Sequence, residues 1–162
     1  MARPFAIPVR LFCAFLAVEL LLCAEDAASV RKEIETTYDR TLRAQRAAKT
    51  AEDLDANERT IDTPDWLSIV NDGAPQHWID LRAGVIATLG HPDEVAIRVV
   101  KFTLAGDHAT VIARVGAPKD VSDDADRSRY ALIRDTWIKT NLGWRRKMHE
   151  KPAPGNLDAQ LK

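Results

Sequence analysis

YALIRDTWIKTNLGWRRKMHEK, the segment Tyr130–Lys151, carries the clearest structural pattern in this chain of 162 residues. Its two halves are rich in residues that favour strands, and Asn141-Leu142-Gly143 between them is a turn signal. Each half contains one tryptophan, Trp137 or Trp144. The segment therefore predicts a β-hairpin near the C-terminal end of the chain.

Two more strands are predicted before this hairpin. From Glu94 the apolar residues follow a period of two, which predicts strands over Glu94–Leu104 and Ala109–Val115. The Gly106-Asp107 pair between them is a second hairpin turn. Because these strands follow one another directly, we expect a curved antiparallel sheet.

Helical spacing dominates the first half of the chain. Ser29–Lys49 predicts a long helix with Val30, Ile34 and Tyr38 on its apolar face. Thr50 opens a second, shorter helix with a capping-box pattern. A short strand at Trp66–Val70, the turn Asn71-Asp72-Gly73 and a third helix from Trp78 to Leu89, ended by Gly90, complete this half. Helices grouped ahead of strands favour an α+β domain, which we place at residues 25–151.

The first 24 residues have the pattern of an export signal. Arg3 and Arg10 precede the apolar run Leu11–Ala24, which ends in a small residue. We expect cleavage near Ala24 and a periplasmic or secreted protein without cysteine, because Cys13 and Cys23 leave with the signal. An uncleaved anchor, a lipid anchor at Cys23 and a cytoplasmic protein are the alternatives. Residues 152–162 predict a loose, flexible tail.

Composition and missing motifs limit the function classes. The chain has 23 basic and 24 acidic residues, a net charge of −1, which argues against nucleic-acid binding. His77, His91, His108 and His149 lack the spacing of metal ligands. There is no glycine-rich phosphate loop and no nucleophile elbow. We therefore expect neither a metal nor a nucleotide or flavin cofactor.

The order of these elements resembles the nuclear transport factor 2-like superfamily, more narrowly its SnoaL-like and ketosteroid-isomerase-like bacterial members. The resemblance rests on the long helix with Tyr38, the Asn71-Asp72-Gly73 turn before Trp78, and the hairpin from Arg134 to Trp144. It implies a cystatin-like cone, in which the sheet wraps around the first helix and leaves a pocket. It also implies frequent homodimerisation through the outer sheet face.

Asp135 is the first candidate for chemistry. In an apolar pocket its carboxylate would suit a general base, with Tyr38 as a hydrogen-bond donor or His149 as a proton-transfer partner. The alternative is an Asp135 that pairs with Arg114 or Arg146 on a solvated face. On a regular last strand, Arg146 would share a face with Trp144 and Met148, whereas His149 would lie on the opposite face with Arg145 and Lys147.

The candidate pocket residues are aromatic or charged. Trp66, Trp78, Trp137 and Trp144 could line a pocket for a flat ligand or simply fill the core. Arg146, if it points inward, needs Asp135 or an anionic ligand as its partner. Asp62 near the expected pocket mouth could contact a ligand or cap a turn.

Three functions follow from these residues. The first is an exported domain that binds a small apolar or carboxylate-bearing molecule. The second is a cofactor-free isomerase, dehydratase or cyclase that uses Asp135. The third is a homodimeric interaction module. Under each of the three, we expect contact with a membrane only through the signal segment, before its cleavage.

Overall fold

The computed structural model describes residues 26–89, 94–122, 125–157 and 161. The expected signal segment, with Cys13 and Cys23, and the expected helix stop at Gly90 lie outside these ranges. In chain order the elements are α2 (Ala27–Ala47), α3 (Ala51–Ile61), β1 (Asp62–Val70), α4 (Trp78–Ile86), β2 (Ala96–Ala105), β3 (His108–Gly116), β4 (Ala131–Thr140) and β5 (Gly143–Lys151), with short 3-10 turns at Pro118–Asp120 and Arg127–Arg129.

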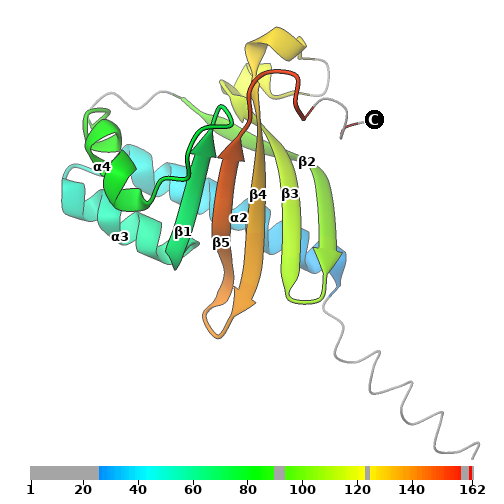
Figure 1. Cartoon of the computed structure of the whole chain (residues 1–162), viewed down its shortest axis with the longest axis horizontal. Coiled ribbons are helices and arrows are strands. Elements are labelled where there is room, and N and C mark those ends of the chain that lie inside the picture. The colour runs from blue at the N-terminus through cyan, green and yellow to red at the C-terminus, as the bar shows by residue number, and fades with distance from the viewer. Residues whose placement is uncertain (1–25, 90–93, 123–124, 158–160, 162) are drawn as a thin grey trace, which may run out of the picture.

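The strands form one sheet in the order β1-β5-β4-β3-β2 (Figure 1). Strands β2 to β5 pair antiparallel with their sequence neighbours, as the sequence predicts. The first strand, β1, joins this sheet in parallel to β5, with Ser68 opposite His149. The sheet is therefore mixed, and the expectation of a purely antiparallel sheet is wrong for this edge strand.

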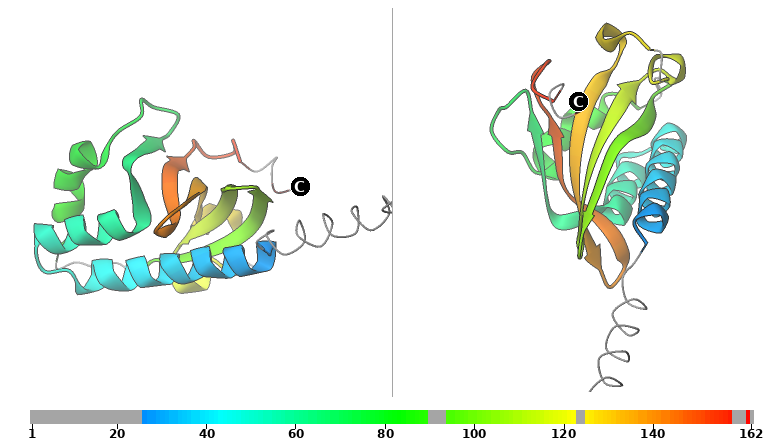
Figure 2. Two further views of the ribbon diagram at one scale, coloured as in Figure 1. Left: turned by 90° about the horizontal axis from the view of Figure 1, so that it is seen from below. Right: turned by 90° about the vertical axis from the view of Figure 1, so that its right-hand side faces the viewer.

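The long helix α2 lies along one face of the curved sheet (Figure 2). Asp26 caps its first turn by accepting a hydrogen bond from the backbone N–H of Ala28 at 3.2 Å. Val30, Ile34 and Tyr38 are buried one turn apart and pack against the sheet, with Trp137 of β4 at the centre of the core. The predicted apolar face of this helix is thus the face that meets the sheet.

The capping box predicted at Thr50 begins α3. The Thr50 hydroxyl accepts from the backbone N–H of Asp53 at 3.2 Å, and the Asp53 carboxylate accepts from the backbone N–H of Thr50 at 3.0 Å. The helix runs back along α2 and passes at Ile61 directly into β1. This connection holds the last turn of α3 against the edge of the sheet.

The turn after β1 sends the chain toward α4. Asn71 and Asp72 have φ of 52° and 58°, and the backbone N–H of Gly73 donates to the carbonyl of Val70 at 3.0 Å. Helix α4 begins at Trp78, as predicted, but ends at Ile86 rather than at Leu89. Beyond Ile86 the chain continues as tighter turns up to Leu89. The predicted turn is confirmed, and the helix is shorter than expected.

The β4–β5 hairpin contains a bulge that changes which side chains face the core. At its turn, Gly143 adopts φ of 93°, which glycine reaches without strain. Along β5, Met148 pairs with Thr136 but Arg146 pairs with Trp137, so Lys147 is the extra residue. The last strand is therefore not regular, and the face-sharing expected for a regular strand does not apply beyond the bulge.

The bulge places Arg146 and His149 on the same face. His149 lies opposite Asp135, and Arg146 lies opposite Trp137, although the two β5 residues are three positions apart. A regular strand would have put them on opposite faces. Both residues can therefore meet the same buried carboxylate on β4.

The outer sheet face carries a smaller apolar cluster. Ile112 and Leu132 are nearly fully buried there, and Leu157 from the tail packs against them with 3% of its surface exposed. Leu157 therefore belongs to this outer cluster, and the loose tail at residues 152–162 stays a prediction. Within the described residues, no helix is both long and apolar enough to cross a membrane.

Candidate functional site

Asp135 on β4 is the centre of a buried polar cluster. The Tyr38 hydroxyl donates to Oδ2 of Asp135 at 2.5 Å, and Nδ1 of His149 lies 2.7 Å from Oδ1. The indole N–H of Trp137 donates to the Tyr38 oxygen at 3.3 Å, and the two rings meet edge to face. The structure thus brings together the three residues that the sequence suggested for proton transfer, and Asp135 has no exposed surface.

Arg146 connects this cluster to the edge strand β1 and to α3. Its guanidinium lies 3.8 Å from Oδ2 of Asp135 and binds Asp62 with two hydrogen bonds of 2.7 and 3.1 Å. It also lies 3.7 Å from the Glu58 carboxyl and over the ring of Trp66. One buried cation is therefore shared by three carboxyl groups from α3, β1 and β4.

The charges of the cluster depend on these contacts. Burial alone would raise the pKa of Asp135, but His149, Arg146 and the Tyr38 hydroxyl hold it below its ordinary value. Burial and the nearby Asp135 raise the pKa of Tyr38 well above 10.0, so Tyr38 stays neutral. Arg146 keeps its proton, because its carboxylate neighbours outweigh burial and raise its pKa.

This cluster is well suited to hold the core together. Both oxygens of Asp135 are occupied by protein partners, and neither Asp135, Tyr38 nor His149 lines the cavity described next. The alternative of a solvated Asp135 does not fit, because the side chain is fully buried. Its pairing with Arg146, one of the two arginines considered from the sequence, is observed.

A cavity of about 830 Å³ opens beside the sheet, between α3, β1, α4 and the β4–β5 turn. Its wall is formed by Asp55, Glu58, Arg59, Asp62, Thr63, Pro64, Trp66, His77, Trp78, Ile79, Arg82, Thr140, Asn141, Leu142 and Arg145. Of the candidate pocket residues, Trp66, Trp78 and Asp62 lie in this wall. Arg146 lies behind it and contacts the cavity residues Asp62 and Glu58.

The remaining two tryptophans belong to the core. Trp137 has no exposed surface and Trp144 is 5% exposed, and both pack with α2 and the sheet. For these two residues the structure matches the core-filling alternative. Trp144 also borders a separate groove of about 550 Å³ along α2.

Asp55 fixes one wall of the cavity by holding α4 to α3. Its carboxylate accepts from the indole N–H of Trp78 at 2.8 Å and from two nitrogens of Arg82 at 2.8 and 2.9 Å. The hydrogen bonds from Arg82 and Trp78 lower the pKa of Asp55 to about 2. The wall therefore has a fixed ion pair across the two helices.

Glu58 is a cavity residue that sequence reasoning missed. It is 7% exposed, and burial followed by its hydrogen bond to Asp62 raises its pKa to about 8. The signal was present in the sequence, because Leu54, Glu58 and Ile61 share one face of α3. A glutamate on the apolar face of a helix predicts a buried carboxyl.

Two apolar cavity residues were also missed because they look like ordinary surface positions. Ile79 and Leu142 are 73% and 72% exposed, and both line the cavity. Ile79 follows Trp78 on α4, and Leu142 lies in the hairpin turn. Only the tertiary fold brings α4 and this turn to the wall of one cavity. Among the described residues, no group of three His, Cys, Asp or Glu side chains is placed to hold a metal ion.

Comparison with known proteins defines the fold. No family model matches the chain. No curated protein matches it with significance. Solved structures do match it, and several of them are described as NTF2-like or as having a cystatin-like fold.

Three of these structures show the extent of the likeness. The Kfla4162 protein of Kribbella flavida has a TM-score of 0.55 and 21% identity, covering 84% of this chain and 98% of its own. An NTF2-like protein of Novosphingobium aromaticivorans with a cystatin-like fold has a TM-score of 0.51 and 22% identity, covering 89% and 91%.

The third structure, an NTF2-like protein of unknown function from Silicibacter pomeroyi, has a TM-score of 0.57 and 7% identity, covering 78% of this chain and 97% of its own. At such identities the likeness concerns the fold. This chain therefore has the α+β fold of the nuclear transport factor 2-like superfamily, as the resemblance implied.

Proposed function

We propose that this chain is an exported domain that binds a small, largely apolar molecule in the cavity beside α4. The observation that carries the proposal is the position of Ile79 and Leu142. Both are more than 70% exposed, and both line the cavity of about 830 Å³. A cavity of this size falls within the usual range for small-molecule sites, about 300–1,000 Å³.

The chemistry of the wall supports binding. Trp66 and Trp78 add aromatic surface to Ile79 and Leu142, and the Asp55–Arg82 ion pair holds α4 in place. A fixed wall lowers the entropy cost of binding, because fewer groups must be ordered when the ligand arrives. An apolar body would cover side chains that otherwise face water.

The enzyme proposal, a cofactor-free isomerase, dehydratase or cyclase, has one observation in its favour. Tyr38 and His149 converge on Asp135 at hydrogen-bond distance. We place it second because Asp135 is fully buried and its two oxygens already have protein partners. A general base must reach the proton that it removes.

Homodimerisation through the outer sheet face is the third proposal. It receives less support, because Leu157 of the same chain already covers Ile112 and Leu132. Light scattering of the purified protein distinguishes the two states: a monomer at micromolar concentration contradicts the dimer, and a mass twice that of the chain supports it.

Export is proposed from residues 1–24 alone. The positive residues followed by an apolar run and a small residue are typical of a cleaved signal. N-terminal sequencing of the periplasmic or secreted protein tests it. A start near Glu25 supports cleavage, whereas an intact Met1 contradicts it.

Binding is tested with phenylnaphthylamine, an uncharged apolar dye whose fluorescence rises in apolar sites. Ile79→Gln and Leu142→Gln should each weaken binding about fivefold, because each removes on the order of 1 kcal/mol of apolar contact. Val70→Gln is the matched control, because Val70 is also an exposed large apolar residue but does not line the cavity. Absence of binding, or equal effects of all three changes, contradicts the proposal.

A further inference from the structure

The acidic side chains of the cavity wall already have basic partners. Asp55 is bound by two nitrogens of Arg82, and Asp62 is bound by two nitrogens of Arg146 at 2.7 and 3.1 Å. Paired in this way, the two carboxylates contribute little net charge to the cavity. A cationic ligand would have to displace one of these arginines.

The third acid of the wall, Glu58, is crowded by like groups. It is nearly buried and hydrogen-bonds to Asp62, and Arg146 is shared between them and Asp135. Three carboxyl groups around one cation leave an excess of acid, which one group relieves by keeping its proton. Burial raises the pKa of Glu58 to about 8, so Glu58 is the group that stays mostly neutral at pH 7.

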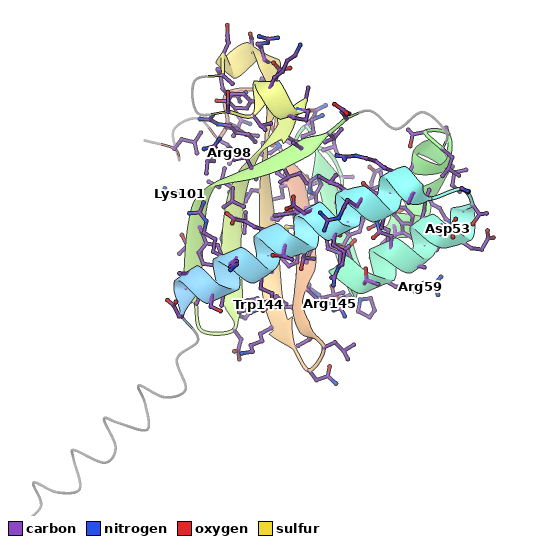
Figure 3. All side chains as sticks on the ribbon, turned by 180° about the vertical axis from the view of Figure 1, so that it is seen from behind. Asp53, Arg59, Arg98, Lys101, Trp144 and Arg145 are labelled. Atoms are coloured by element: carbon purple, nitrogen blue, oxygen red, sulfur yellow. The ribbon has the colours of Figure 1, made fainter. Side chains whose placement is uncertain are left out.

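Two arginines of the wall form no side-chain hydrogen bond or ion pair with an acid in the described part of the chain. Within the described residues, Arg59 forms no ion pair, and its Nε donates only to the backbone carbonyl of Asp55, at 3.0 Å. Arg145 likewise has no ion pair in the described part of the chain. Figure 3 labels Arg59 on α3 and Arg145 on β5, both on the lower side of that view. Both residues line the cavity.

These observations bear on the chemistry of a ligand. We infer that the cavity takes an amphipathic anion, an aromatic or aliphatic body with one carboxylate or comparable oxyanion, whose charge lies beside Arg59 and Arg145. The body contacts Trp78, Ile79 and Leu142. Guanidinium groups match oxyanions in geometry as well as charge, which favours this class over neutral molecules. This inference rests on the proposed binding function.

A pair of dyes that differ by one charged group tests the inference. Anilinonaphthalenesulfonate carries a sulfonate that phenylnaphthylamine lacks, and the aromatic bodies are otherwise the same. In low salt, the anionic dye should bind about tenfold more tightly, because two part-exposed ion pairs each contribute a few-fold. Raising the salt concentration should reduce this preference.

Substitution locates the anion. The double variant Arg59→Gln/Arg145→Gln should bring the ratio of the two dissociation constants close to one. Arg43→Gln is the control, because Arg43 is an exposed arginine of α2 that does not line the cavity. It should leave the ratio unchanged.

Each outcome decides between the two proposals. Equal affinities for both dyes, or a preference that survives the double substitution, overturns the anion inference and leaves the binding function standing. If neither dye binds, the proposed function itself fails. A preference lost equally in Arg43→Gln also overturns the inference, because it would reflect the overall charge of the protein.

Discussion

Replacing Glu58 by glutamine should make the protein more stable at neutral and alkaline pH. Burial and the hydrogen bond to Asp62 raise the pKa of Glu58 from 4.5 to about 8 in the folded protein. The positive charge of Arg146 and a hydrogen bond with the Gln45 side chain both lower the pKa of Glu58, but they do not cancel this rise. Glutamine keeps the size and a donor for Asp62 but cannot lose a proton.

The direction of the pH effect on stability depends on whether the folded or the unfolded protein holds the proton of Glu58. Between pH 4.5 and about 8 the folded protein keeps a proton that the unfolded chain has released, so stability falls as pH rises through this range. At about 1.4 kcal/mol for each tenfold change in proton affinity, the complete loss is on the order of 3–5 kcal/mol. Below the pKa that Glu58 has in the unfolded chain, its contribution to the free energy of unfolding is fully present. Above the pKa that Glu58 has in the folded protein, this contribution is gone.

Urea unfolding at a series of pH values measures this effect. Glu58→Gln should match the unchanged protein within about 1 kcal/mol near pH 5 and exceed its free energy of unfolding by on the order of 3 kcal/mol near pH 8.5. Glu52→Gln, an exposed glutamate on the same helix, is the control and should give a parallel curve. If the Glu58→Gln curve is also parallel, Glu58 is not a protonated buried acid.

Three further changes test the contacts around the cavity and the core. Asp135→Asn should lower the free energy of unfolding by about 3–5 kcal/mol at pH 7, because Arg146 and His149 lose their buried anion. This loss should shrink as pH falls below the pKa of an aspartate in the unfolded chain, because the pKa of Asp135 is lowered in the folded protein. A loss under 1 kcal/mol at pH 7 in urea unfolding would contradict the buried network. Asp55→Ala should speed hydrogen exchange in Trp78–Ile86 without affecting β3, because α4 loses its link to α3; unchanged exchange in α4 would contradict this role. Thr50→Ala should cost about 1 kcal/mol in thermal unfolding, because α3 loses its capping box, and an unchanged melting temperature would contradict the cap.

Local patterns predicted most of the elements. The apolar period of α2, the Thr50 capping box and the turn at Asn71 and Asp72 depend on residues close together in sequence, and each is found where predicted. The parallel pairing of β1 with β5 was not predicted. These strands are about 80 residues apart, and a parallel pair has no connecting turn that could signal it.

The candidate site depends on features that the sequence does not show. The bulge at Lys147 reverses the alternation along β5, and only this brings both Arg146 and His149 to Asp135. The cavity depends on α4 packing against α3 through Asp55, a contact between residues 23 and 27 positions apart. Chemistry-bearing residues such as Asp135 and Tyr38 were found from sequence, whereas the open space lies elsewhere.

The most direct test of the binding proposal uses the four tryptophans as internal reporters. Each indole N–H gives its own signal in a two-dimensional nitrogen–proton spectrum, and a titration with anilinonaphthalenesulfonate shows which of them sense the ligand. Binding in the cavity beside α4 predicts that the Trp66 and Trp78 signals move, while those of the core residues Trp137 and Trp144 stay in place. Movement confined to Trp137 and Trp144, or no movement at saturating dye, would contradict it.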